Sequence, residues 1–197
     1  MKEKIYINIK NINCYRNNLN VFRNISFTVR SKDFVIIRGK NGSGKTSLLL
    51  GLAGILCFDG DIKWKKGLNK IGYVGHKNAL KENERVNDYI DFWLDFYQSS
   101  CKKEDIIKQY SLKNILDYQT NLLSFGQKKL LSFLRLHMLK SLVWLLDEPL
   151  SGLDKKNKGL ILERIEKHNN SGGATVMTTH DESYLDYKGL LKEIKIV

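Results

Sequence analysis

The segment "GKNGSGKT", residues 39–46, constrains the fold more than any other part of this chain. It matches the pattern G-x-x-x-x-G-K-[ST] and follows a short apolar run at 33–39 that is typical of a buried strand. The residues after it, 45–56, have the length and composition of a helix. Such a turn presents consecutive backbone N–H groups to a phosphate. The sequence therefore predicts a phosphate-binding loop in an α/β fold.

Two side chains of this loop have expected roles of their own. Lys45 would reach the outer phosphates of a nucleotide as a point charge, and the Thr46 hydroxyl suits a magnesium ion. The residues predicted to bind the nucleotide in this segment are Gly39, Lys40, Asn41, Gly42, Ser43, Gly44, Lys45, Thr46 and Ser47.

A second apolar run, "LVWLLDEP", delivers two acids from the end of a predicted buried strand. In open α/β sheets, ligands lie beyond the carboxyl ends of the strands. Asp147 could hold a magnesium ion or its water shell. Glu148 could polarise a water in line with a γ-phosphate.

The run "ATVMTTH" predicts another strand with His180 at its carboxyl tip. Taken alone, this residue is most simply a surface histidine in a loop. Because a second strand also delivers polar groups to the same edge of the sheet, we favour a functional role. A neutral imidazole could hydrogen-bond the γ-phosphate or the attacking water.

The stretch "NLLSFGQKKLLSFLR" begins with small turn formers and continues as an amphipathic helix. Ser124 and Gly126 occupy its predicted N-terminus, where free N–H groups and the helix dipole favour an anion. Residues 123–127 contain no lysine or acid. The pattern therefore predicts an anion site without catalytic groups of its own.

The order of predicted elements indicates one domain with an insertion. Alternating or apolar strands are predicted at 4–12, 21–29 and 70–76, with a hairpin or connecting strand around "DGDIKWKKG". Helical patterns fill about 77–140, at 82–97, 103–110 and 112–118, and a further helix follows at 155–170. We expect a single domain, 1–197, with an α/β core interrupted by a helical subdomain at about 77–140.

The formal net charge of +12 allows two interpretations. One is a surface for nucleic acid or an anionic membrane; the other is a lysine-rich composition spread over solvated loops and helix faces. The densest clusters, "KWKKG" and "CKKEDIIK", are short, so we favour the second and expect no specific nucleic-acid partner.

Cysteine usage and hydropathy exclude several other classes. Cys14, Cys57 and Cys101 are odd in number and widely spaced, which argues against a disulfide framework or a zinc site and fits a reducing compartment. No apolar run reaches about 18 residues, so no transmembrane helix is expected. The charged, alternating N-terminus is unlike a secretory signal. A membrane role would require a partner.

The motifs together resemble those of the ATP-binding-cassette (ABC) ATPases. Residues 39–46, 123–127 and 142–148, "SGLD" at 151–154, and His180 occur in the order of that family's Walker A, signature, Walker B, D-loop and switch-histidine motifs. The resemblance implies a P-loop NTPase with a RecA-like core, an N-terminal antiparallel β-subdomain and an inserted α-helical subdomain. It also implies ATP and Mg²⁺ as cofactors.

Carried over residue by residue, the resemblance assigns specific roles. Glu148 resembles the general base, His180 the γ-phosphate sensor, and Asp154 the D-loop aspartate that communicates across a dimer. Tyr15 resembles the aromatic residue that stacks on adenine, although a tyrosine in a strand is often simply core. The signature residues would contact the ATP of a partner copy in a homodimer closed around the nucleotide: Ser124, Phe125, Gly126 and Gln127.

Two positions depart from the usual family pattern. Phe125 stands where the signature motif usually has glycine, so local packing must differ there. His76 stands where the loop after a core strand usually presents a glutamine to magnesium and to the transmembrane partner. His76 is therefore a candidate metal ligand alongside Thr46 and Asp147.

Further features resemble one subfamily, the ATP-binding subunit of the haem exporter in cytochrome c biogenesis (the CcmA family). They are the Gly75-His76 pair, the short chain, the helix "NDYIDFWLDFY" and the closing "GGATVMTTHDES". This resemblance implies a peripheral ATPase bound to integral permease subunits and to a haem-chaperone complex. The expected location is the cytoplasmic face of the inner membrane, or the matrix face of the mitochondrial inner membrane if the gene is organellar.

Three alternatives stay open. The chain could serve another ABC exporter. A soluble cassette ATPase acting on RNA or ribosomes would suit the charge, but that class generally carries tandem cassettes or long coiled coils that 197 residues do not accommodate. A P-loop kinase or GTPase would lack the motif at 123–127.

Overall fold

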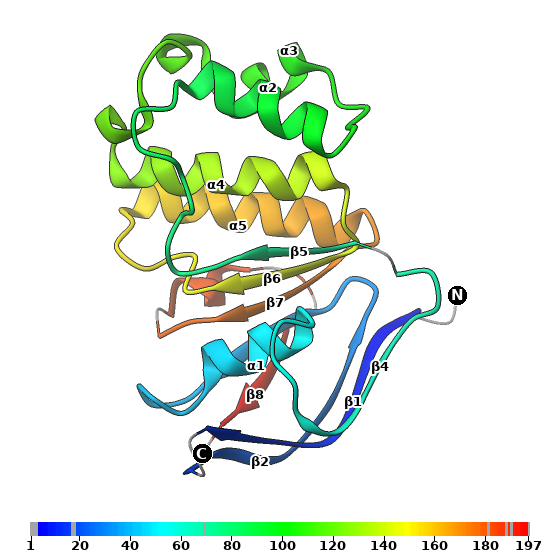
Figure 1. Ribbon diagram of the computed structural model, residues 1–197. Coiled ribbons are helices and arrows are strands. Elements are labelled where there is room, and N and C mark those ends of the chain that lie inside the picture. Colours follow the sequence, from blue (N-terminus) through cyan, green and yellow to red (C-terminus); the bar gives the residue numbers. More distant parts are fainter. Residues whose placement is uncertain are drawn as a thin grey trace.

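Two β-sheets with a helix between them organise the molecule (Figure 1). The structure is a computed structural model that describes residues 4–16, 19–68, 70–180, 182–187, 189 and 191–196. A parallel sheet has the strand order β5-β6-β7-β3-β8, and an antiparallel sheet has the order β2-β1-β4. The strands are β1 (Ile5–Arg16), β2 (Leu19–Arg30), β3 (Phe34–Arg38), β4 (Asp59–Trp64), β5 (Ile71–Val74), β6 (Val143–Asp147), β7 (Ala174–Thr178) and β8 (Leu191–Lys195).

Helices cover both faces of the parallel sheet. Figure 1 shows α1 between the two sheets, α4 and α5 against the other face, and α2 and α3 beyond α4. The α-helices are α1 (Lys45–Leu52), α2 (Val86–Phe96), α3 (Lys103–Gln109), α4 (Phe125–Leu139) and α5 (Lys155–Asn170). Short 3-10 helices occur at Lys113–Ile115, Thr120–Leu122 and Glu182–Asp186.

The apolar runs of the central strands explain this layering. In β3, Val35 and Ile37 pack with α1 and the antiparallel sheet, whereas Phe34 and Ile36 pack with the α4 and α5 side. A strand buried on both faces must be apolar at every position, which "FVII", "VWLL" and "ATVM" satisfy. The carboxyl ends of β3, β6 and β7 are thereby fixed at one edge of the sheet, where the predicted site residues follow.

Most predicted elements are present, with two differences. Only residues 113–115 of the expected helix at 112–118 are helical, as a 3-10 turn. Strand β8 was not predicted, because "LKEIK" is short, charged and half exposed at an edge of the sheet. The elements between β5 and β6 are helical; the subdomain boundaries at about 77 and 140 stay a prediction. Within the described part of the chain, no helix combines the length and apolarity needed to cross a bilayer.

A half-buried histidine connects α5 to β6. The ring of His168, in the last turn of α5, stacks on the Trp144 ring with centroids 3.9 Å apart and planes 6° from parallel. Burial lowers the pKa of His168 to about 4, and hydrogen bonding to the backbone at Ala174 and Leu142 opposes that shift only in part. The folded chain therefore carries a neutral imidazole at neutral pH.

This depressed pKa predicts acid sensitivity. In the unfolded chain His168 has the ordinary histidine pKa of about 6.5, so between that pH and its pKa in the folded chain the unfolded chain binds more protons than the folded chain. The stability that the neutral His168 contributes is therefore complete above about pH 6.5 and is lost as the pH falls toward the lower pKa. From pH 7 to pH 4, the free energy of unfolding should fall by about 3 kcal/mol more in the wild type than in His168→Phe, which keeps the ring stack. Urea unfolding at each pH measures the difference, and parallel pH profiles would contradict it.

Candidate functional site

The loop between β3 and α1 has the backbone geometry that its glycines predict. Gly42 and Gly44 have φ values of +81° and +93°, in the left-handed region that other residues rarely adopt. A Cβ on Gly44 would also lie 2.8 Å from Cδ1 of Phe22 in β2. Glycine at position 44 therefore allows the loop to turn into α1 directly beneath β2.

Lys45 lies across this loop. Its Nζ donates hydrogen bonds of 3.0 Å to the carbonyl oxygens of Gly39 and Lys40, and the residue is only 7% exposed. The hydroxyl of Ser43 is buried without a hydrogen-bond partner among the described residues. The loop thus holds a cation and a spare hydroxyl group for which a phosphate is a suitable partner.

Asp147 is held by two hydroxyl groups from neighbouring elements. Its Oδ2 accepts a hydrogen bond of 2.9 Å from Thr46 Oγ1, and its Oδ1 accepts one of 2.6 Å from Thr178 Oγ1. The residue is 3% exposed. The start of α1 and the ends of β6 and β7 therefore meet at the Asp147 carboxylate. This carboxylate and the adjacent Thr46 hydroxyl both offer oxygen atoms of the kind that bind Mg²⁺.

Glu148 follows in an unusual backbone conformation. Its φ is +50°, which is uncommon for a residue other than glycine and is often found at functional sites. Its N–H donates to Thr178 Oγ1 at 3.0 Å and lies 3.2 Å from the Thr178 carbonyl oxygen. These contacts hold the backbone of Glu148, and its side-chain Oε1 lies 3.4 Å from Nε2 of His180.

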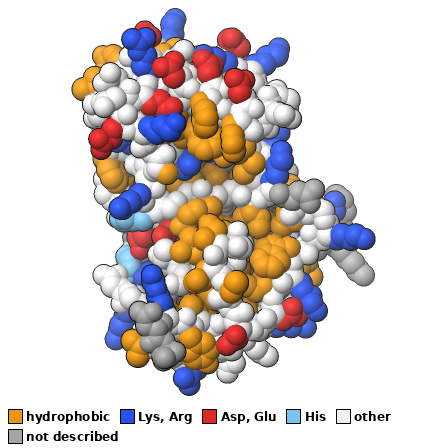
Figure 2. All heavy atoms as spheres, in the orientation of Figure 1, with side chains coloured by type: hydrophobic (Ala, Val, Ile, Leu, Met, Phe, Trp, Pro, Cys, Tyr) orange, Lys and Arg blue, Asp and Glu red, His pale blue; other side chains and the backbone are white. Residues whose placement is uncertain are grey.

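Four of the residues described above, Lys45, Thr46, Glu148 and His180, line a common cavity of about 620 Å³. Figure 2 shows histidine and acidic side chains meeting on the surface beside a broad hydrophobic region. The polar and charged side chains that line the cavity include Arg16, Lys45, Thr46, His76, Glu148 and His180. The structure therefore brings the predicted loop, the second predicted acid and the predicted histidine together.

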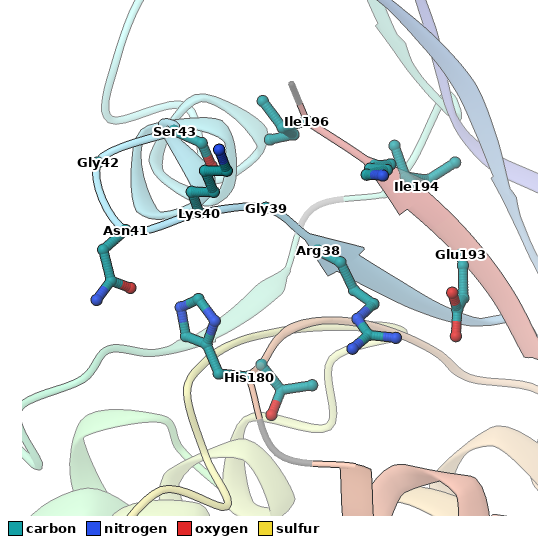
Figure 3. A pocket seen from close by; sticks show the side chains of 12 residues that line it. Arg38, Gly39, Lys40, Asn41, Gly42, Ser43, His180, Glu193, Ile194 and Ile196 are labelled. Carbon is teal, nitrogen blue, oxygen red and sulfur yellow. The ribbon is translucent and has the colours of Figure 1, made fainter.

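A larger cavity of about 1110 Å³ lies across the loop, toward β8. Asn41 and His180 border it, and Figure 3 shows the His180 ring pointing toward the loop. Neither Thr46 nor Glu148 lines this second space. The groups with reactive chemistry therefore belong to the smaller cavity, and His180 lies between the two.

The segment at 123–127 lies outside that cavity. Ser124 caps α4: Gln127 N–H donates to Ser124 Oγ at 3.2 Å, and Ser124 N–H donates to Gln127 Oε1 at 2.8 Å. Because the Ser124 hydroxyl acts here as an acceptor, its proton is still available to an anion. The structure does not bring Ser124 and Gly126 together with the loop of the same chain.

The same segment packs against the start of α5. Phe125 is 52% exposed, and its ring covers Gly152, where a Cβ would lie 3.1 Å from Cε1 of the phenylalanine. A Cβ on Gly126 would lie 2.5 Å from Nδ2 of Asn157. Asp154 caps α5 by accepting a hydrogen bond of 2.8 Å from Asn157 N–H. The segments at 123–127 and 151–154 therefore form one packed unit.

Two further residues, Tyr15 and His76, make no contact with the described part of the chain that tests their predicted roles. Tyr15 is 52% exposed on β1 and is not among the residues that line the cavity, although its neighbour Arg16 is. His76 lines the cavity, and its carbonyl oxygen lies 3.4 Å from Nζ of Lys129. Adenine stacking by Tyr15 and metal ligation by His76 stay predictions.

Lys129 was missed by the sequence reasoning. It is 1% exposed on α4; burial lowers its pKa, whereas the nearby carboxylates of Asp147 and Glu148 favour the charged form. Within "GQKKLL" it resembles an ordinary solvated lysine. The available signal was its spacing from Gly126 and Phe133, which puts all three residues on one helix face.

Comparisons with known proteins agree with this geometry. A family model described as "ABC transporter" matches residues 22–151. The chain is similar to the "Cytochrome c biogenesis ATP-binding export protein CcmA" of Wolbachia pipientis wMel, at 32% identity over 88% of this chain and 89% of the relative. It is also similar to the protein of that name from Rickettsia bellii, at 34% identity over 91% of this chain and 94% of the relative.

Solved structures show the same fold. A nucleotide-free ATP-binding cassette from an ABC transporter has a TM-score of 0.79 at 21% identity, over 98% of this chain and 90% of that chain. The ADP conformation of an ATP-binding cassette has a TM-score of 0.78 at 21% identity, over 98% and 89%.

The hydroxyl of Thr178 should be essential to the geometry around Asp147. Thr178→Val removes a hydrogen bond to a buried carboxylate and another from Glu148 N–H, so the free energy of unfolding should fall by about 2–3 kcal/mol. The matched control Thr178→Ser keeps the hydroxyl and should cost about 1 kcal/mol for the lost methyl group. Urea unfolding at pH 7 measures both, and a valine variant as stable as the serine variant would rule out this role.

Proposed function

The chain belongs to the ABC transporter family as an ATPase subunit, and from that premise we propose that it serves a transporter complex of c-type cytochrome biogenesis. The complex would be a haem exporter, or a machine that releases a haem-loaded chaperone. The observation that carries the catalytic part is the continuous set of contacts from Thr46 through Asp147 and Thr178 to Glu148. The specific role rests on the relatives' names.

The donor set fits ATP with Mg²⁺. Lys45 and the loop N–H groups would hold the phosphates, and Thr46 and Asp147 offer hard oxygen ligands. The described residues contain no cluster of three or more His, Cys, Asp or Glu that could hold a metal alone. That fits magnesium, which commonly takes one or two protein ligands and completes its shell with phosphates and water. Bound there, it would neutralise phosphate charge.

Glu148 is the proposed general base. Its carboxylate lies in the cavity beside Lys45 and Thr46, and the Thr178 contacts fix its backbone. It would accept a proton from a water positioned for attack on the γ-phosphate. His180, 3.4 Å from Glu148 Oε1, would hydrogen-bond the γ-phosphate or that water and so report nucleotide occupancy.

The signature segment is proposed to act on a second copy of the chain. Ser124 and Gly126 form a capped helix N-terminus outside their own chain's cavity. In a homodimer they would contact the γ-phosphate held by the partner's loop. The segments at 123–127 and 151–154 pack together, so a contact of Ser124 with the partner's nucleotide would also affect the position of the 151–154 segment. In the same dimer, Asp154 would face the second copy. ATP turnover would then require the dimer.

As an ABC transporter ATPase, the chain associates with membrane permease subunits. We propose that it is peripheral on the cytoplasmic face of the inner membrane, or on the matrix face in an organelle. A role in another ABC exporter would keep every catalytic assignment and change only the partner. Co-purification with a small polytopic protein supports the transport role, whereas salt-sensitive RNA binding without a membrane partner supports a soluble ATPase.

Replacing Glu148 by glutamine tests the base. Glu148→Gln should bind ATP with wild-type affinity, hydrolyse it at least about 100-fold more slowly, and accumulate as a nucleotide-bound dimer. ATPase assays and light scattering measure the two effects. Lys45→Ala is the control that should neither bind ATP nor dimerise. Hydrolysis at the wild-type rate by Glu148→Gln would contradict the assignment.

Phe125 should contribute to the same dimer. In a Glu148→Gln background, Phe125→Gly removes a half-exposed aromatic ring from the proposed interface and should weaken ATP-dependent dimerisation about tenfold. Phe125→Leu keeps an apolar side chain and should retain most of the affinity. Sedimentation with ATP measures both variants, and an undiminished dimer in Phe125→Gly would show that the ring lies outside the interface.

A further inference from the structure

A cavity of about 330 Å³ opens at the amino end of β6, between the ends of α3, α4 and α5. We call it the rear cavity. In Figure 1 the arrowheads of β5, β6 and β7 point left, whereas α4 and α5 end at the right, beside the start of β6. The rear cavity is therefore at the opposite end of β6 from Asp147, and the proposed ATPase mechanism does not use it.

The lining of the rear cavity is strongly basic. It contains Lys140, Arg164 and Lys167 together with two histidines, and no aspartate or glutamate occurs among the described residues that line it. Lys167 pairs with Glu163 at 2.5 Å, Lys140 donates to Ser100 Oγ at 2.5 Å, and Arg164 donates to the carbonyl of Gln109. Of these three cations, only Lys167 forms a salt bridge with a carboxylate among the described residues.

Helix ends explain part of this charge, because cations are favourable near the carbonyl groups that end α4 and α5. That effect is weak and would not require cations to converge on one cavity. Burial lowers the pKa of the half-buried His137, and the charges of Arg164 and Lys140 lower it further. The positive charges around the rear cavity therefore disfavour protonation of His137.

Unpaired polar groups lie in the same wall. Ser141 Oγ, Trp144 Nε1, Arg164 Nε and His168 Nε2 are buried and have no hydrogen-bond partner among the described residues. Ser141 is 4% exposed and Trp144 is 5% exposed. An unsatisfied buried polar group costs about 1–3 kcal/mol, and the hydroxyl of Ser141 and the N–H groups of Trp144 and Arg164 are hydrogen-bond donors, so together they point to a ligand with several acceptor oxygens.

We propose that the rear cavity binds a small oxyanion of the phosphate type, either the free ion or the phosphate group of a small metabolite. Arg164 forms the main charged contact and Lys140 lies at the mouth. Ser141 and Trp144 in the wall adjust to donate to its oxygens. The volume exceeds that of one phosphate, which leaves room for the rest of a small molecule. This site is independent of the proposed ATPase function.

The three tryptophans allow a direct test, because each indole N–H gives its own signal in a ¹H–¹⁵N spectrum. Inorganic phosphate is titrated at constant ionic strength against the full chain carrying Lys45→Ala, which suppresses binding at the nucleotide loop. The Trp144 indole should shift with saturation, while those of Trp64 and Trp93 serve as internal references. A Trp144 signal that moves no more than the references overturns the proposal.

Variants assign the binding to this cavity. Arg164→Gln should weaken phosphate binding about tenfold through loss of a charge-assisted hydrogen bond, and Lys140→Gln, at an exposed position, should also weaken it. Lys156→Gln makes the same charge change at the far end of α5 and should have no effect. If all three variants weaken phosphate binding equally, or if no variant weakens it, the proposal is overturned.

A second titration with glycerol phosphate distinguishes the two possible ligands. Tighter binding of glycerol phosphate than of inorganic phosphate identifies the phosphate group of a small metabolite, whereas weaker binding identifies the free ion.

Discussion

One buried carboxylate holds the catalytic half of this molecule together. Asp147 accepts hydrogen bonds from Thr46 at the start of α1 and from Thr178 at the end of β7. The Thr178 hydroxyl oxygen also accepts a hydrogen bond from the backbone N–H of Glu148, the next residue after Asp147, which has a positive φ. The positions of the phosphate loop, the proposed base and the strand that precedes His180 therefore depend on one another.

The sequence was sufficient for the parts of this arrangement that local chemistry dictates. Short apolar runs such as "FVII" and "VWLL" are typical of buried parallel strands with helices on both faces, and the carboxyl ends of such strands share an edge of the sheet. The glycines of residues 39–46 predicted a tight loop between a strand and a helix, and Gly42 and Gly44 adopt positive φ values in that loop. Ser124 and Gln127, three residues apart, form the capping box typical of that spacing.

Other features depend on contacts between distant segments and leave little local trace. Lys129 is buried only because α4 packs over β5 and β6, and strand β8 exists only because β3 offers it an edge. The unusual aromatic residue at 125 was visible in the sequence, but its position over Gly152 was not. The unpaired donors of the rear cavity become evident only once α4, α5 and β6 are assembled.

The central claim is that a complete ATPase site needs the loop of one copy and the Ser124 segment of another. Mixing two inactive variants tests it directly: Lys45→Ala lacks nucleotide binding, and Ser124→Arg lacks a usable signature segment. A mixed dimer has one complete site out of two, formed by the loop of the Ser124→Arg copy and the Ser124 segment of the Lys45→Ala copy, so ATPase activity should recover to at most about half of the wild-type rate. A mixture as inactive as either variant alone would contradict the account.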